Sequence, residues 1–134
     1  MSPEELAGAV RGAVLRDFPA VDALVLHGSR ARSDHRQDSD WDLGVLSSDG
    51  ADLASLVTLL VDTLGTEAVD VVDLGRASAL LRYRAARDGI TLVERTPGVV
   101  ERFRVDATIY WCDAGPVIRA AQAGLLADLR AGAR

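Results

Sequence analysis

The sequence contains no lysine, a single cysteine and few aromatic residues, which make up 4% of its 134 positions. Because Cys112 is alone, the chain cannot form an internal disulfide, which fits a reducing compartment. We interpret Cys112 as a small packed residue of a helix. Without lysine, the chain has no ε-amino group for a Schiff base, and every positive contact with a phosphate must come from arginine.

Long apolar runs and a basic excess are missing as well. No signal peptide and no apolar stretch approaching a membrane span of about 20 residues is present, so we expect a cytoplasmic protein without membrane association. The formal net charge of −5 and the pI of about 4.9 leave no basic surface that could follow a nucleic-acid backbone, and we expect no direct nucleic-acid binding. A chain of 134 residues can bury one core but hardly two, which predicts a single domain over residues 1–134.

The most informative motif begins at a glycine-serine turn. The apolar run Ala23–Leu26 predicts a buried strand, and the strand must end at the tight turn Gly28-Ser29. A short helix that opens at Ser29 would point free backbone N–H groups and the Ser29 hydroxyl toward an anionic phosphate. On its own, Gly-Ser is usually an ordinary turn, so the motif gains weight only from the carboxylates that come after it in the chain.

Two aspartates come after this turn at strand spacing. Side chains two residues apart on an extended strand project from the same face, so Asp40 and Asp42 lie side by side while Trp41 packs on the other face. Neighbouring carboxylates repel each other, and a hard cation with oxygen ligands, such as Mg²⁺, relieves that repulsion. The pair therefore predicts a metal site.

A calcium loop is an alternative interpretation of the same carboxylates. Asp38, Asp40 and Asp42 occupy the first, third and fifth positions of such a loop. The sixth position should be glycine and is Leu43, and the twelfth should be a bidentate glutamate and is Asp49. The calcium loop fails at both places, whereas a plain solvated acidic loop stays open.

A third carboxylate is expected if two metal ions are to bridge a triphosphate. The segment Val69–Leu74 supplies two candidates, Asp70 and Asp73, which lie on opposite faces of a strand. An aspartate inside an apolar, β-branched run is costly unless it is paired or metal-bound. We interpret Asp70 as the third ligand and Asp73 as a strand-end or helix-capping residue, with the exchanged roles as the alternative.

These motifs together resemble the DNA polymerase β-type nucleotidyltransferase superfamily over roughly the first 95 residues. The resemblance rests on His27–Arg32, Ser39–Leu43 and Val69–Val72, and it is closer to the minimal nucleotidyltransferases, the MNT proteins encoded beside HEPN-domain toxins. Two positions depart from the family, which commonly has glycine at Ser33 and an aliphatic residue at Trp41. Both departures bear on the shape of the loop rather than on the metal ligands.

The resemblance implies a fold and a set of site residues. It implies a mixed sheet of about four strands with helices packed on it, and two Mg²⁺ ions held by Asp40, Asp42 and Asp70. It also implies that Gly28 and Ser29 contact the phosphates of a nucleotide. These roles are expectations taken from the family.

Three basic side chains lie close to the expected site in the sequence. Arg30 and Arg32 flank the phosphate turn, and their guanidinium groups could neutralise a triphosphate bidentately. The alternative is a solvated loop in which they pair with Asp34 or Asp38. We interpret His27, at the end of the strand, as a packing residue.

Periodicity predicts an α/β (α+β) fold, with an α/β core over about residues 1–95 and a helical segment over about residues 98–134. A capping box at Ser2 opens a first helix that ends by Pro19. Further helices are expected over about residues 52–64 and 76–88, a strand over 90–93, and C-terminal helices interrupted by Gly115-Pro116.

The C-terminal segment carries two apolar stripes. We expect both stripes to cover the sheet, and the alternative is that the aromatic-rich first stripe is exposed for a partner. The first stripe consists of Phe103, Ala107, Tyr110 and Trp111, and the second of Val117, Ala121, Leu125 and Leu129.

The chain has no room for a separate acceptor-binding domain, so we expect the acceptor to come from outside. The resemblance to MNT antitoxins implies transfer of AMP from ATP to a tyrosine hydroxyl of a cognate HEPN RNase toxin, which neutralises the toxin. Two alternatives stay open. One is a non-catalytic antitoxin that masks the toxin, and the other is a small-molecule nucleotidyltransferase of the aminoglycoside-modifying type.

Overall fold

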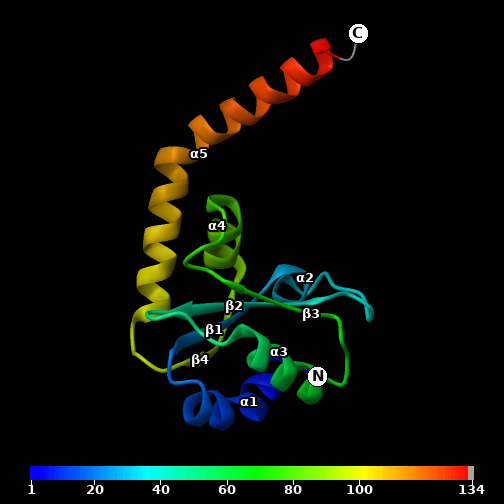
Figure 1. Cartoon of the computed structure of the whole chain (residues 1–134), viewed down its shortest axis with the longest axis vertical. Coiled ribbons are helices and arrows are strands. Elements are labelled where there is room, and N and C mark those ends of the chain that lie inside the picture. Colours follow the sequence, from blue (N-terminus) through cyan, green and yellow to red (C-terminus); the bar gives the residue numbers. More distant parts are fainter. Residues whose placement is uncertain (133–134) are drawn as a thin grey trace.

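The computed structural model describes residues 1–132, which form a four-stranded sheet and five helices (Figure 1). This arrangement confirms the predicted α/β class. In chain order the elements are α1 (Pro3–Asp17), β1 (Val21–His27), α2 (Gly28–Arg32), β2 (Trp41–Ser47), α3 (Leu53–Leu64), β3 (Val69–Asp73), α4 (Ala79–Asp88), β4 (Ile90–Glu94) and α5 (Val99–Gly132).

The sheet is mixed, with strand order β3-β2-β1-β4. β1 pairs antiparallel with both β2 and β4, whereas β2 and β3 are parallel. Parallel neighbours need a crossover connection, and α3 provides it. The parallel pairing places Asp42 of β2 directly beside Asp70 of β3.

Helices cover both faces of the sheet. Figure 1 shows α1 and α3 on one face and α4 with the first half of α5 on the other. Strand β1 is buried along most of its length because it is central and covered on both sides, which explains its continuous apolar sequence. The main core lies between the sheet and α1 and α3, and a second cluster around Phe103 and Leu74 lies under α4 and α5.

The signals at the helix ends are confirmed with one exception. The Ser2 hydroxyl accepts a hydrogen bond from the Glu5 backbone N–H at 3.1 Å, and Gly65 ends α3 in the left-handed conformation. The start of α4, expected near residue 76, was wrong by three residues. Ser78 is its N-cap and accepts from the backbone N–H of Leu81, so the preceding residues form a turn.

The predicted interruption of the C-terminal helix was also wrong, because α5 runs as one helix from Val99 to Gly132. In Figure 1 the helix changes direction where its colour turns orange, in the region of Gly115-Pro116. Proline removes one backbone donor from the helix interior and crowds the preceding turn, which bends a helix without ending it.

The first apolar stripe of α5 is buried at its beginning and packs on α4 at its end. Phe103 and Ala107 are buried, whereas Tyr110 is exposed and Trp111 stacks on Tyr83 of α4 with the ring centroids 5.6 Å apart. Cys112 is exposed, so its interpretation as a packed residue was wrong.

The second apolar stripe does not cover the sheet, contrary to the expectation. Val117, Leu125 and Leu129 are 71%, 60% and 62% exposed. Figure 1 shows this half of α5 extending beyond the body of the molecule, and we call residues 117–132 the C-terminal arm. Across residues 1–132, none of the helices combines the length and apolarity that crossing a bilayer requires.

Candidate functional site

The phosphate turn lies in direct contact with one of the predicted carboxylates, Asp42. Gly28 begins α2 immediately after β1 and has a φ of +71°, a conformation that other residues adopt only with strain. A side chain at this position would collide with the Asp42 carboxylate. Glycine is therefore required both for the turn and for the close approach of the turn to Asp42.

Three neighbouring strands place three titratable side chains in one row. His27 of β1 pairs with Asp42 of β2, and Asp42 pairs with Asp70 of β3. Residues paired across a sheet project from the same face, and adjacent strands lie about 4.8 Å apart. The register therefore brings Asp42 and Asp70 together, as predicted for two of the three metal ligands.

The electrostatics of this row favour a bound cation. Burial raises the pKa of Asp42 above its usual value, and the negative charges of Asp70 and Asp40 raise it further, whereas His27 and Arg32 lower it. A carboxylate that is partly desolvated beside like charges gains the most from a positive ligand. The donor set, which consists of carboxylate oxygens, suits a hard cation such as Mg²⁺.

His27 is buried at the edge of this row. Its side chain is 6% exposed and its Nε2 atom has no hydrogen-bond partner. Burial lowers the pKa of His27, while Asp42 and Asp70 oppose the shift. The packing role expected for His27 fits its burial, but the ring also borders the cavity in front of the carboxylates.

A cavity of about 370 Å³ opens in front of this row. Of the expected site residues, Gly28, Ser29, Arg32, Asp42 and Asp70 line it. The cavity therefore brings together the phosphate turn, the cationic side chain of Arg32 and the carboxylates of Asp42 and Asp70. This arrangement suits a ligand that carries phosphates and a metal ion.

Arg84 of α4 also lines the cavity, and the sequence analysis missed it. Together with Arg32 it places two cations opposite two carboxylates. Nothing in the local sequence marks Arg84, because it reaches the site only through the packing of α4 over the sheet. A search of the sequence for basic residues one turn apart on α4 would have found Arg84 only as one of several candidates.

Asp40 stands apart from the cavity. It is exposed and lies just before β2, but its charge contributes to the raised pKa of Asp42. Within residues 1–132, no three histidine, cysteine or acidic side chains converge closely enough to hold a metal ion as they stand. Asp42 and Asp70 are thus placed to share a metal ion, whereas the side chain of Asp40 would have to rotate toward them to join the site.

Asp73 faces a different environment from Asp70. Its Oδ1 atom accepts a hydrogen bond from the Gly75 backbone N–H at 2.9 Å, and its Oδ2 atom lies 3.9 Å from Nε of Arg76. Asp73 therefore closes the turn after β3, and Asp70 is the aspartate that lies beside Asp42.

The structure does not bring Arg30 to the cavity, contrary to the expectation that it lies beside the phosphates. Its guanidinium donates two hydrogen bonds to the Ser39 carbonyl, at 3.0 and 3.1 Å, and stacks over the Trp41 ring. Arg32 does line the cavity, and it also forms the alternative ion pair with Asp34 at 3.2 Å.

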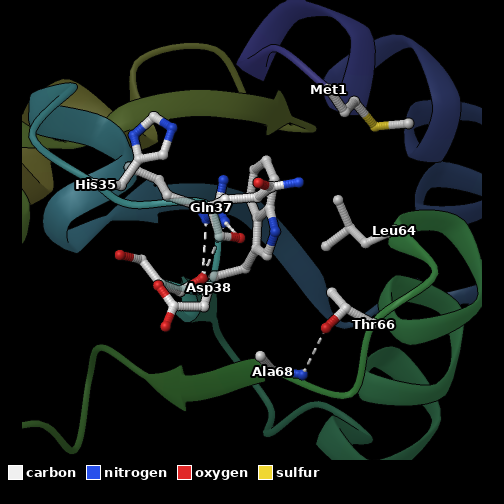
Figure 2. Close-up of a pocket in the computed structure, with 10 residues that line it drawn as sticks. Met1, His35, Gln37, Asp38, Leu64, Thr66 and Ala68 are labelled. Carbon is white, nitrogen blue, oxygen red and sulfur yellow. Dashed lines mark hydrogen bonds between the residues drawn. The ribbon is translucent and has the colours of Figure 1, made fainter.

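A larger cavity, of about 570 Å³, lies against the loop that precedes β2 (Figure 2). His35, Gln37 and Asp38 of that loop border it, together with Leu64 at the end of α3 and Thr66 of the α3–β3 connection. It contains none of the three candidate metal ligands. We therefore place the candidate active site in the smaller cavity, where the carboxylates and the phosphate turn meet.

Comparison with known proteins identifies a family. Residues 12–97 match the model of the polymerase beta nucleotidyltransferase family. Protein adenylyltransferase MntA of Aphanizomenon flos-aquae (strain 2012/KM1/D3) is 30% identical over 103 residues, which cover 68% of this chain and 69% of that protein.

Two solved structures share the fold. A crystal structure of a toxin–antitoxin with AMP-PNP has a TM-score of 0.71 at 24% identity, covering 92% of this chain and 98% of the other. An MNT antitoxin in complex with the tri-AMPylated HEPN toxin of Shewanella oneidensis has a TM-score of 0.66 at 24% identity, covering 96% and 98%.

The strand order, the carboxylate pair and the phosphate turn define a nucleotidyltransferase. With the family match over residues 12–97, the chain belongs to the polymerase beta nucleotidyltransferase family.

Proposed function

We propose that this chain is an Mg²⁺-dependent protein adenylyltransferase that acts as an antitoxin. It would transfer AMP from ATP to a tyrosine hydroxyl of a HEPN-domain RNase toxin and so neutralise the toxin, with residues 1–134 acting as one nucleotidyltransferase unit. The observation that carries the proposal is the pairing of Asp42 with Asp70 in a cavity that also holds the phosphate turn. The similarity to a protein adenylyltransferase supports the reaction, and the structure of an MNT antitoxin with an AMPylated HEPN toxin supports the acceptor.

The nucleotide would bind across the cavity. The backbone at Gly28 and the hydroxyl of Ser29 would contact the phosphates, while Arg32 and Arg84 would neutralise their charge. The sequence alone assigned this neutralising role to Arg30 and Arg32, and the placement of the side chains favours Arg84 over Arg30.

The carboxylates would hold the metal ions. Asp42 and Asp70 would be the central ligands and Asp40 the third. When bound, two Mg²⁺ ions would acidify the acceptor hydroxyl and stabilise the leaving pyrophosphate. The tyrosine oxygen would form a bond to the α-phosphorus as the bond to the β-phosphate oxygen breaks, so that AMP stays on the toxin and pyrophosphate leaves.

The test is a transfer reaction with defined components. The chain is incubated with ATP, Mg²⁺ and the HEPN-domain protein of its own genomic neighbourhood, and the mass of each protein is measured. We expect whole adenylate increments on a tyrosine of the HEPN protein, lost with EDTA and with the Asp42→Asn variant.

Other outcomes point to the two alternative functions. If the HEPN protein stays unmodified while wild-type and Asp42→Asn chains both neutralise it in cells, the chain is a masking antitoxin. Transfer of AMP to an aminoglycoside in the absence of any protein acceptor would indicate a small-molecule enzyme. Either result would overturn the proposal.

A further inference from the structure

One arginine side chain ties the phosphate turn to the loop that carries Asp40. Arg30 comes directly after Ser29 in α2, and its guanidinium crosses to the loop before β2. Its Nε and Nη2 atoms donate to the Ser39 carbonyl at 3.1 and 3.0 Å, and Nη2 also donates to the Gln37 carbonyl at 3.1 Å. Because Ser39 directly precedes Asp40, these bonds fix the backbone on the N-terminal side of Asp40.

The same guanidinium also contacts the residue after Asp40. Its central carbon lies 4.2 Å from the centroid of the Trp41 ring, which is 6% exposed and packed in the main core. Arg30 therefore touches the residues on both sides of Asp40. Arginine is suited to this double contact, because its planar group donates in its plane and stacks through its face, which lysine cannot do.

Few other contacts hold the loop in place. Within it, the Arg36 N–H donates to the Ser39 hydroxyl and the Ser39 N–H donates to the Arg36 carbonyl. The Trp41 N–H donates to the Ala68 carbonyl at 2.8 Å, which holds the backbone after Asp40 in the sheet. The cavity of about 570 Å³ in Figure 2 borders the loop, so one side of it lacks packing. The backbone before Asp40 thus depends on the contacts of Arg30.

We propose that Arg30 and Trp41 form a clamp that positions Asp40 for metal binding, and that Arg30 is a positioning residue rather than a phosphate ligand. The inference rests on the proposed function, because it assumes that Asp40 is a metal ligand. The clamp holds the backbone of Asp40 so that its side chain projects from the same face as that of Asp42. A rotation of the Asp40 side chain would then complete the site. It also gives Trp41 a role that an aliphatic residue could not fill.

The test measures metal binding without the acceptor. Mn²⁺ binding to the full chain with AMP-PNP is followed by electron paramagnetic resonance in the wild type, Arg30→Lys, Trp41→Leu and the double variant. Residues that orient metal ligands typically change metal affinity 10- to 100-fold, so we expect each single variant to bind Mn²⁺ at least about tenfold more weakly. The double variant should be no weaker than the worse single variant, because both substitutions break the same clamp.

Matched controls separate the clamp from charge and from folding. Arg16→Lys is a control for the arginine-to-lysine change at an exposed ion pair and should bind Mn²⁺ like the wild type. Trp41→Phe keeps an aromatic platform and should bind Mn²⁺ more tightly than Trp41→Leu. Thermal melting shows whether each variant folds, and Arg30→Gln replaces Arg30→Lys if the latter does not.

Two results would overturn the clamp. One is unchanged Mn²⁺ affinity in folded Arg30 variants. The other is weaker binding of AMP-PNP by the folded Arg30 variants in metal-free buffer, which would make Arg30 a phosphate ligand. Failure of the proposed function is visible separately, because a wild type that binds Mn²⁺ through this clamp but leaves the HEPN protein unmodified would keep the clamp and reject the acceptor.

Discussion

At Gly28 the backbone of the phosphate turn lies against the carboxylate of Asp42, so one glycine couples the two halves of the site. We expect Gly28→Ala to lower AMP transfer at least about 100-fold, because the new methyl group must displace a metal ligand by a distance that misaligns the reacting atoms. The positive φ adds a stability cost of about 1–2 kcal/mol. Transfer rates and urea unfolding measure the two effects.

Gly8→Ala is the matched control for this change. Gly8 lies in α1 with open space around its position, and alanine is the better helix former by about 1 kcal/mol. The control should gain stability and keep full activity. Equal activity of the two variants would contradict the contact inferred at Gly28.

The fold disfavours the ionised form of Asp42. Its pKa is raised by burial, so folding favours its protonated form, and that contribution is lost as the pH rises through the raised pKa. In EDTA at pH 7, Asp42→Asn should therefore melt above the wild type. The gap should shrink as the pH falls through the raised pKa of Asp42, because the wild-type carboxyl then takes up a proton. A variant that melts below the wild type at pH 7 would be evidence against this interpretation.

Single residues show where sequence analysis reaches its limit. Strand parity singled out Asp42 together with Asp40, and the cost of a carboxylate in an apolar run singled out Asp70. The pairing of Asp42 with Asp70 came only from the register of β2 and β3. Arg30 could not be placed, because a long flexible side chain beside the turn reaches both the phosphates and the Ser39 carbonyl. The choice depends on where the loop lies, and Arg84 likewise depends on the packing of another helix.

At the scale of elements, Arg95 joins the end of α1 to the sheet. Its guanidinium donates to the Val14, Leu15 and Phe18 carbonyls at 3.0–3.1 Å, which leaves these end-of-helix acceptors satisfied, and to the Val21 carbonyl at 3.0 Å. We expect Arg95→Ala to lower the free energy of unfolding by about 1–3 kcal/mol, because a charged donor to four part-buried carbonyls is lost. The Val14 and Phe18 carbonyls keep only the backbone N–H groups of Phe18 and Val21 as donors. Chemical unfolding monitored by circular dichroism provides the measurement.

Arg16→Ala serves as the comparison, since Arg16 is 73% exposed in a surface ion pair with Asp17. It should leave the midpoint of thermal unfolding within about one degree of the wild type. Similar losses in both variants would show that Arg95 acts through charge alone and not as a cap.

Periodicity and capping residues were sufficient to predict most elements, and tertiary context accounts for the differences. The stripe of α3 and the glycine after it defined that helix almost to the residue. The start of α4 was misplaced because Ser78 competes with earlier polar residues as a cap. The continuity of α5 was missed because proline bends a helix or ends it depending on what surrounds it, and the local sequence is the same in both cases.

At the scale of the whole molecule, the body and the C-terminal arm are separable. Among the residues whose burial the structure describes, the last buried one is Ala107, and every proposed site residue lies before Asp88. A chain that stops after Cys112 should therefore keep its melting temperature within about 3 °C and bind AMP-PNP with Mg²⁺ as the full chain does. Thermal melting and calorimetric titration measure both, and a loss of nucleotide binding would show that the arm supports the site.

The order of the sequence also sets the order in which these parts are made. The arm comes after every residue of the site, and chains are synthesised at about 5–20 residues per second, so the 16 residues from 117 to 132 take roughly one to three seconds. During that time the body already has all its strands. We therefore expect the strands to be able to pair before the exposed Val117, Leu125 and Leu129 emerge, which lowers the risk that the arm joins a misfolded core.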